Sequence, residues 1–468
     1  MKGSDHSRCD IVAPMGATLL IKNLDAIGLF EDGRREIRPG WIAIEGPAIR
    51  ALGPGEPPPE HARAEETIDG SGLVAIPGLV NTHHHLYQTL TRAWLPAANC
   101  SLFPWLEALY PVWARLDDEA VRLGALVGMA ELMLSGCTTA ADHHYVFPER
   151  AKGGLEAEVA AVREIGIRLH ATRGSMSLSK KDSGLPPEAV VETHDEILAA
   201  SERAVGAHHD AARFSMCRVG LAPCSPFSVT PALMRDTAAL AARLGVTLHT
   251  HLAENAQDVA YSLAQYGKRP VAYLEEMGWL DARAWLAHGI HFDDAEVARL
   301  GRARVGVAHC PSSNMRLGSG IARVQALRAA GSPVGIGVDG SASNDSSNLI
   351  QECRQALLLT RVAHGAEAIT VEEVFRMATV EGAACLGRDD IGRLVPGYAA
   401  DIALFALDGV EHAGCHDPLA ALLLATTTRV HTLVVNGRVR VRRGAFVEFD
   451  LARVVAAHRA AARRLVAA

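Results

Sequence analysis

Eight repeats of one unit constrain the fold of this chain more than any other feature of its sequence. Each unit is a short apolar or β-branched run that ends in polar residues and is followed by a helical stretch rich in Ala, Leu, Arg and Glu. Alternating strand and helix signals predict parallel strands, and eight such units predict an α/β fold with a closed (β/α)8 TIM barrel. The eight runs end at Asn81–His83, Ala141–His143, Ala171–Arg173, Ala222–Cys224, Thr250–Leu252, Ala287–Gly289, Ala308–Cys310 and Val338–Gly340.

The two ends of the chain have a different character. From about Thr18 to Asp69, short strand-like runs are separated by Gly and Pro, and Ala400–Phe405 and Thr432–Gly437 are similar short runs. Such runs are typical of β structure. We therefore expect one small β-sandwich domain, composed of residues 1–78 and 392–468, beside a metal-dependent barrel domain of residues 79–391.

Two histidine pairs stand at the ends of predicted barrel strands, where this fold keeps its chemistry. His83 and His85 are two residues apart, so they share one face of a strand, while His84 points into the wall. His249 and His251 form a second such pair. Taken alone, either pair is more often a pair of ordinary core or rim histidines than a metal site.

Other strand ends favour the metal interpretation. His288 ends the sixth run and Asp339 the eighth, so a closed barrel brings them to the same mouth as the histidine pairs. Three imidazoles and one carboxylate suit a borderline divalent ion such as zinc and leave a position for water. Glu254 follows His251 by three residues, where its carboxylate can turn toward that water as a proton carrier.

The connection from Leu86 to Gly136 is unusually aromatic for a chain with only 5% aromatic residues. Long connections after barrel strands often cover the active site. Packing against the barrel rim, or a subunit interface, is an equally good interpretation. The aromatic residues in question are Trp94, Phe103, Trp105, Tyr110 and Trp113.

Composition excludes several classes of partner. Half of the 468 residues are apolar and the net charge is only −7, so neither a basic nucleic-acid footprint nor an acidic tail is present. The nine cysteines include no C-x-x-C pair, which favours a reducing compartment. Neither an apolar leader after Met1 nor a run of eighteen apolar residues is found. We expect a cytoplasmic protein with no membrane or nucleic-acid partner, which acts on a small molecule and forms a homo-oligomer.

In combination, the motifs resemble those of the amidohydrolase superfamily, in the group of deaminases that act on purine, pterin and triazine rings. The resemblance covers nearly the whole chain, and the order and spacing of its motifs make it specific. The matching segments are Pro77–His85, His251–Glu254, Ala287–His288, Ala308–Asn314, Leu317–Gly320 and Val338–Asn344.

The resemblance implies a role for each strand-end residue. It implies the metal ligands His83, His85, His251 and Asp339, the proton shuttle Glu254 and the substrate-orienting residue His288, with Glu254, His288 and Asp339 as the catalytic group. Members with two metals place a bridging lysine at the end of the fourth strand, where this chain has Cys224. That departure favours one ion per chain, zinc or alternatively iron(II).

Within this group the chain is most similar to 8-oxoguanine deaminases, which implies the conversion of 8-oxoguanine to urate and ammonia. This similarity lies in the segments His84–Arg92, Tyr110–Leu116 and Thr172–Lys180. Gln88 and Arg173 follow the first and third strand ends, where an amide and a guanidinium can bind ring carbonyls and nitrogens. A loop-bracing hydrogen bond or salt bridge is an equally good interpretation of both.

Other functions remain open at this point. Relatives that deaminate isoxanthopterin, guanine or hydroxylated aminotriazines share the framework, and the same metal centre could hydrolyse a cyclic amide without releasing ammonia. A metal-stabilised scaffold without activity is a third class. The presence of Glu254 and His288 weighs against it, because a structural metal site is usually closed and needs no proton shuttle.

Overall fold

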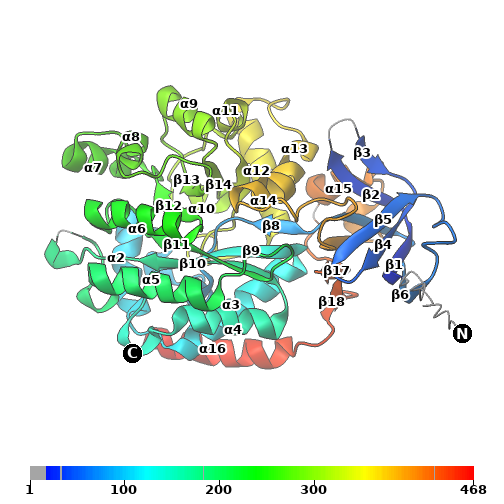
Figure 1. The fold of residues 1–468 in the computed structure, drawn as a ribbon, viewed down its shortest axis with the longest axis horizontal. Coiled ribbons are helices and arrows are strands. Elements are labelled where there is room, and N and C mark those ends of the chain that lie inside the picture. Colours follow the sequence, from blue (N-terminus) through cyan, green and yellow to red (C-terminus); the bar gives the residue numbers. More distant parts are fainter. Residues whose placement is uncertain (1–16, 32–33, 183, 426, 468) are drawn as a thin grey trace, which may run out of the picture.

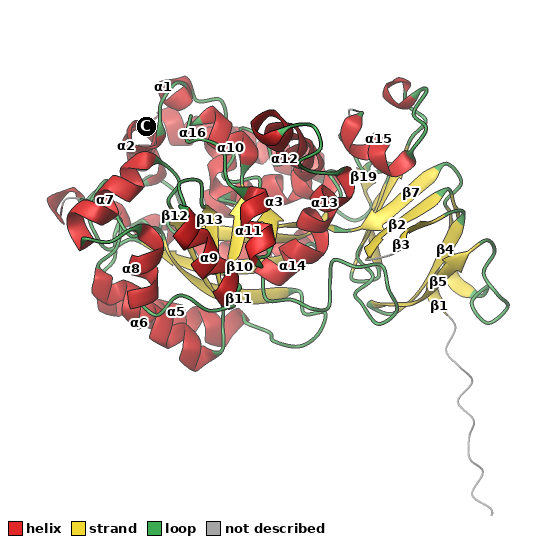
Figure 2. Cartoon of the chain, turned by 90° about the horizontal axis from the view of Figure 1, so that it is seen from above, coloured by secondary structure: helices red, strands yellow, loops and turns green. Residues whose placement is uncertain are grey.

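The computed structural model describes residues 17–31, 34–182, 184–425 and 427–467. The chain forms a barrel surrounded by helices and, beside it, a part made of two β-sheets (Figures 1 and 2). Blue strands from the start of the chain and orange strands from its end lie together in that second part (Figure 1).

The eight predicted barrel strands are all present, which confirms the TIM barrel. They run parallel and close in the order β10-β11-β12-β13-β14-β15-β8-β9. Their register brings strand ends level: Leu252 of one strand pairs with His288 of the next. The strands are β8 (Leu79–Asn81), β9 (Cys137–His144), β10 (Arg168–Ser175), β11 (Cys217–Pro223), β12 (Leu248–Leu252), β13 (Ala284–His288), β14 (Gly306–His309) and β15 (Val334–Ile336).

The two further sheets form the predicted β-sandwich. One sheet has the order β5-β4-β1-β6 and the other β19-β18-β17-β16-β7-β2-β3. Buried side chains of both sheets, such as Ile21 and Ile402, share one hydrophobic core. The strands are β1 (Ala17–Leu24), β2 (Ala26–Glu31), β3 (Arg34–Ile37), β4 (Gly40–Glu45), β5 (Ala48–Pro54), β6 (Ala64–Asp69), β7 (Leu73–Pro77), β16 (Ile402–Ala406), β17 (Thr432–Val435), β18 (Arg438–Arg442) and β19 (Ala445–Phe446).

Helices cover the barrel, and local sequence sets their ends. Asn255 accepts a hydrogen bond from the N–H of Asp258 (2.9 Å) and so caps the start of α7, while Gly245 (φ 69°) ends α6 in the left-handed conformation. The helices are α1 (Leu95–Ala98), α2 (Leu102–Trp113), α3 (Asp118–Leu134), α4 (Gly154–Ile165), α5 (His194–His208), α6 (Pro231–Leu244), α7 (Ala256–Tyr266), α8 (Pro270–Glu276), α9 (Asp294–Ala303), α10 (Pro311–Arg316), α11 (Val324–Ala330), α12 (Leu349–His364), α13 (Val371–Arg376), α14 (Gly382–Cys385), α15 (Pro418–Leu424) and α16 (Leu451–Ala467), and a 3₁₀ turn, η1 (Leu86–Thr91), follows β8. No helix of the described residues combines the length and apolarity that crossing a membrane requires.

The C-terminal helix α16 departs from the expected domain boundary. It packs against α3 and η1 of the barrel, although the boundary places residues 392–468 in the β domain. Nε2 of His458 in α16 lies 3.1 Å from the hydroxyl of Thr89 in η1, so a hydrogen bond joins the two elements. The last helix therefore belongs to the barrel layer, because its apolar face is buried there. Residues 1–16 of the expected β domain lie outside the described residues.

Candidate metal centre

Four side chains from three strand ends converge at the carboxyl mouth of the barrel. His83 and His85 follow β8, His251 belongs to β12, and Asp339 follows β15. Asp339 Oδ1 lies 3.3 Å from His83 Nε2 and 3.4 Å from His85 Nε2, and the Nε2 atoms of His85 and His251 are 3.1 Å apart. The structure thus brings together the four predicted ligand groups.

The hydrogen bonds of His85 and His251 leave two nitrogen lone pairs facing each other. His85 Nδ1 donates to the carbonyl of His143 (2.7 Å), and His251 Nδ1 donates to the carbonyl of Cys224 (2.6 Å). Burial lowers the pKa of His251 to about 3, so the ring is neutral and its single proton is on Nδ1. Two nitrogen lone pairs cannot form a hydrogen bond with each other. A cation between them would satisfy both.

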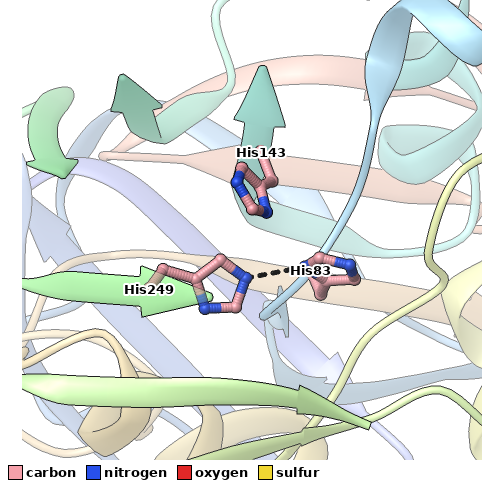
Figure 3. Close-up of side chains that lie close together, drawn as sticks. All are labelled: His83, His143 and His249. Atoms are coloured by element: carbon pink, nitrogen blue, oxygen red, sulfur yellow. Dashed lines mark hydrogen bonds between the residues drawn. The ribbon is translucent and has the colours of Figure 1, made fainter. Parts of the chain in front are cut away.

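A relay of hydrogen bonds orients His83 in the same way (Figure 3). His249 Nδ1 donates to the carbonyl of Trp285 (2.8 Å), so His249 Nε2 accepts the proton of His83 Nδ1 (2.8 Å). The lone pair of His83 is therefore on Nε2, a buried atom that has no hydrogen-bond partner in the segments that the structure describes. His143, which lies beside this pair in Figure 3, donates from Nε2 to the carbonyl of Ala222 (3.0 Å). The donor set fits a divalent cation held by three neutral imidazoles and one carboxylate.

Backbone conformation at two strand ends is unusual. His288 (φ 69°) and Asp339 (φ 62°) both adopt the left-handed conformation that favours glycine. Such strain concentrates at functional sites, where the surrounding structure enforces it. Asp339 is further held by the N–H of Gly340 (2.7 Å) and the hydroxyl of Ser343 (3.1 Å), so its carboxylate has a fixed direction.

Glu254 lies beside the four converging groups, as the sequence predicts. The left-handed turn at Ala253 (φ 51°) follows β12, and Glu254 Oε2 lies 3.5 Å from His288 Nε2. His288 is held in turn through Nδ1 by the side chain of Asn314 (2.9 Å). Burial, together with the charges of Asp258 and Asp339, raises the pKa of Glu254 well above its usual range. A buried carboxyl group with a raised pKa binds a proton more readily than an exposed one, which suits a group that takes up and delivers a proton.

A cavity opens onto these groups. Helix α2 forms part of its wall, so the aromatic connection after β8 covers the mouth as well as packing on the rim. Gln88 lines the cavity, and among the described residues neither the oxygen nor the nitrogen of its buried amide has a hydrogen-bond partner. Gly340 makes room for this amide, since a Cβ there would lie 1.9 Å from Gln88 Oε1. The other lining residues are His85, Leu102, Trp105, Leu106, Tyr110, Tyr145, Cys224, Ser225, Phe227, His251, Glu254, His288, Leu317, Asp339 and Ser343.

Arg173 does not line the cavity. Strand β10 continues to Ser175, so Arg173 lies within the strand, and its side chain turns to Glu192 (2.7 and 2.8 Å) and lies over the ring of Phe147. Of the two interpretations that the sequence left open, the bracing salt bridge therefore fits the structure. We do not propose Arg173 as a substrate-binding residue.

Several site residues were not singled out from the sequence. Asn314 and Ser343 orient His288 and Asp339, and both lie in the segments that carry the resemblance. Tyr145 and Phe227 line the cavity just after β9 and β11. Both follow strand ends, and this position was the only sequence signal that could have identified them. An aromatic residue at such a position is equally often one that packs against the barrel rim.

We expect metal analysis of the purified protein to give one divalent ion per chain. Four side chains surround one point, and the end of β11 offers Cys224 in place of a bridging lysine. Burial raises the pKa of the Cys224 thiol to about 12, so this thiol stays protonated and is a poor ligand for a second ion. Measurement by inductively coupled plasma spectrometry, with a chelator-treated sample as the control, checks the ratio. Two ions per chain would contradict it.

Comparison with known proteins places this geometry among related enzymes. The sequence model of the amidohydrolase family matches residues 74–440. The chain is 52% identical over 428 residues to an 8-oxoguanine deaminase of Pseudomonas aeruginosa, and the match covers 92% of this chain and 95% of that protein. It is 39% identical over 429 residues to an isoxanthopterin deaminase from an unknown prokaryotic organism, over 85% of this chain and 87% of that one.

A solved structure agrees with the fold over almost the full length. An atrazine chlorohydrolase from Arthrobacter aurescens TC1, in complex with zinc, matches with a TM-score of 0.90 and 36% sequence identity. The match covers 95% of this chain and 100% of that chain. Proteins with the same architecture thus include one that binds zinc.

Proposed function

The chain belongs to the amidohydrolase family, and we propose that it is a zinc-dependent hydrolytic deaminase that converts 8-oxoguanine to urate and ammonia. The observation that carries this proposal is the buried Glu254 carboxyl group beside the cluster of three imidazoles and Asp339, at the base of an aromatic cavity. The relative that is 52% identical supports the choice of 8-oxoguanine. A cytoplasmic location and a homo-oligomer stay predictions.

His83, His85, His251 and Asp339 would hold the metal ion. When bound, such an ion lowers the pKa of a water molecule to about 7 and supplies hydroxide at neutral pH. The lone pairs on the Nε2 atoms of the three histidines fit this role, because each Nδ1 atom is occupied by a hydrogen bond.

Glu254 and His288 would carry the proton chemistry of the reaction. In our proposal, Glu254 accepts a proton as water adds to C2 of the purine, and it delivers that proton to the neighbouring ring nitrogen. His288, 3.5 Å from Glu254, orients the ring beside it. The C2–N bond then breaks, the amino group takes the remaining proton of the added hydroxyl group and leaves as ammonia, and C2 becomes a carbonyl. The water oxygen thus replaces the amino group, without oxidation or reduction.

Selectivity for 8-oxoguanine requires polar groups that guanine cannot satisfy. Oxidation turns N7 from an acceptor into an N–H donor and adds a carbonyl at C8, so the pocket must supply one acceptor and one donor. The unpartnered amide of Gln88 offers both within the cavity. Each unpaired buried polar group costs roughly 1–3 kcal/mol, so two mismatches with guanine correspond to about a hundredfold or more in kcat/KM.

A substrate panel tests this proposal. We expect kcat/KM for 8-oxoguanine to exceed that for guanine by about a hundredfold or more. Isoxanthopterin and a hydroxylated aminotriazine should also be slower on the same preparation, with ammonia release as the common readout. If kcat/KM for any of these competitors exceeds that for 8-oxoguanine, the proposed substrate is wrong, although the protein can still be a deaminase.

Isoxanthopterin is the second candidate substrate, because a relative with that activity is 39% identical to this chain. Ring opening of a cyclic amide is a different reaction on the same centre. It releases no ammonia, so the panel also separates it from deamination.

A further inference from the structure

A second group of buried ionisable side chains lies behind strand β9, outside the barrel. Asp142 and His144 flank His143 on this strand and so point to the opposite face from His143, whose ring stacks on His251 at 4.8 Å. Glu158 of α4 completes the group, and potential ligand atoms of the three side chains lie within 4.8 Å of one another. Each of the three residues is at most 1% exposed. The group has no part in the reaction proposed above.

Asp142 contacts the main chain immediately after the proposed ligand His85. Its Oδ1 atom accepts a hydrogen bond from the N–H of Leu86 (2.6 Å). The main chain of His143 adds two bonds to the same stretch, since its N–H donates to the carbonyl of His84 (2.7 Å) and its carbonyl accepts from His85 Nδ1 (2.7 Å). Strand β8 ends at Asn81. These three bonds therefore hold the His84–Leu86 stretch to β9 in place of a strand ladder.

The two carboxyl groups of the cluster are close together in the interior of the protein. Among the residues that the structure describes, neither forms an ion pair with a lysine or arginine, and His144 Nδ1 lies 3.0 Å from Glu158 Oε1. Burial raises the pKa of Asp142 well above its usual range and that of Glu158 to about 8. At neutral pH the pair therefore keeps a proton. In the part of the chain that the structure describes, Asp142 Oδ2 and both carboxyl oxygens of Glu158 lack a hydrogen-bond donor, so a proton shared between the two carboxyl groups would satisfy them.

Helix α4 is adapted to this cluster at its first residue. A Cβ at Gly154 would lie 2.4 Å from His144 Nε2, so a side chain there would displace the imidazole. His144 is thus packed between the start of α4 and the carboxyl group of Glu158, which limits its movement.

We propose that Asp142 is a positioning residue of the metal centre. Its carboxyl group, which lies beside that of Glu158, fixes the main chain at Leu86 and thereby the imidazole of His85. The proposal rests on the proposed function insofar as His85 is a metal ligand. Partners that orient ligands in this way typically change metal affinity or activity by about 10–100-fold when they are removed.

The test measures the rate at which zinc leaves the loaded protein in excess chromogenic chelator, together with the thermal midpoint. Asp142→Ala should accelerate zinc loss by about 10–100-fold. Asp142→Asn should stay within about threefold of the parent, because its amide oxygen still accepts from Leu86 and its NH₂ group replaces the shared proton toward Glu158.

Glu296→Ala is the matched control. Glu296 is another buried carboxyl group of the helical layer, on α9, and it accepts from the N–H of Val271 (3.1 Å) and pairs with Arg269. It does not contact the metal centre, so its removal should lower the thermal midpoint and leave the rate of zinc loss unchanged.

Three results would overturn the proposal. Parent-like zinc loss from Asp142→Ala, with a thermal midpoint lowered as in the control, would make Asp142 a structural residue only. Equal acceleration in Asp142→Asn and Asp142→Ala would contradict the shared proton. If Asp142→Ala does not fold, the rates of zinc loss from Glu158→Leu and Glu158→Gln are compared instead. Only the glutamine amide can still donate a hydrogen bond to Asp142, so equal rates in the two variants would reject the proposal. A parent protein that binds no zinc would instead contradict the proposed function.

Discussion

Glu254→Gln is expected to remove nearly all turnover while leaving the metal bound. The glutamine side chain has almost the same size, but it cannot take a proton from water and deliver it to the ring nitrogen. General acid–base catalysis typically contributes about 10²–10⁴ in rate, so kcat should fall within that range. The wild-type carboxyl group suits the role because its burial raises its pKa well above the usual range. Turnover of 8-oxoguanine and metal content of the same preparation are the two measurements.

A matched variant separates this effect from a general loss of packing. Glu296→Gln also neutralises a buried carboxyl group, on α9 and outside the cavity lining, and it should keep full turnover. A loss smaller than about tenfold in Glu254→Gln would refute the assignment of the proton shuttle. A loss accompanied by an empty metal site would point to a structural role for Glu254.

His85→Asn is expected to abolish metal binding and, with it, activity. His85 Nε2 faces both His251 Nε2 (3.1 Å) and Asp339 Oδ1 (3.4 Å), so its removal deletes one of four ligands and leaves the others without a common centre. The shorter asparagine side chain cannot reach the same point. Metal content should therefore fall from about one ion per chain to a small fraction of that value.

The adjacent residue supplies the control for this variant. His84 is equally buried, but its Nε2 atom bonds to the hydroxyl of Ser347 (2.9 Å), away from the metal centre. His84→Asn should keep the metal ion although it removes an imidazole one position away. If His85→Asn retained full occupancy and activity, the metal centre would lie elsewhere.

Strand periodicity explains why so much of the barrel and its mouth could be predicted. Residues two apart on a strand share a face, and parallel strands end at one rim, so His83, His85, His251 and Asp339 could be placed together without knowledge of any contact. Glu254 was predicted from its distance to His251 along the chain. The turn at Ala253 that aims it was not, because alanine carries no signal for a left-handed conformation.

Features that depend on contacts between distant segments could not be predicted. Arg173 and Gln88 look alike in the sequence, because each is close to a strand end. Only the structure shows that the guanidinium of Arg173 pairs with Glu192, whereas the amide of Gln88 has no hydrogen-bond partner within the described part of the chain. The location of α16 on the barrel likewise follows from its packing against α3 and η1, which includes the contact between His458 and Thr89. A helical pattern indicates which face is apolar but not which surface covers it.

Strand β7 joins the two ends of the chain in one sheet, because it lies between β2 and β16 and pairs Val74 with Phe405. At a synthesis rate of about 5–20 residues per second, the ribosome needs roughly 15–65 s to pass from one of these residues to the other. Throughout that interval the barrel strands emerge while one edge of β7 has no partner. An unpaired strand edge can bind another chain. A nascent or prematurely terminated chain that lacks β16 therefore leaves one edge of β7 open to pairing with another chain.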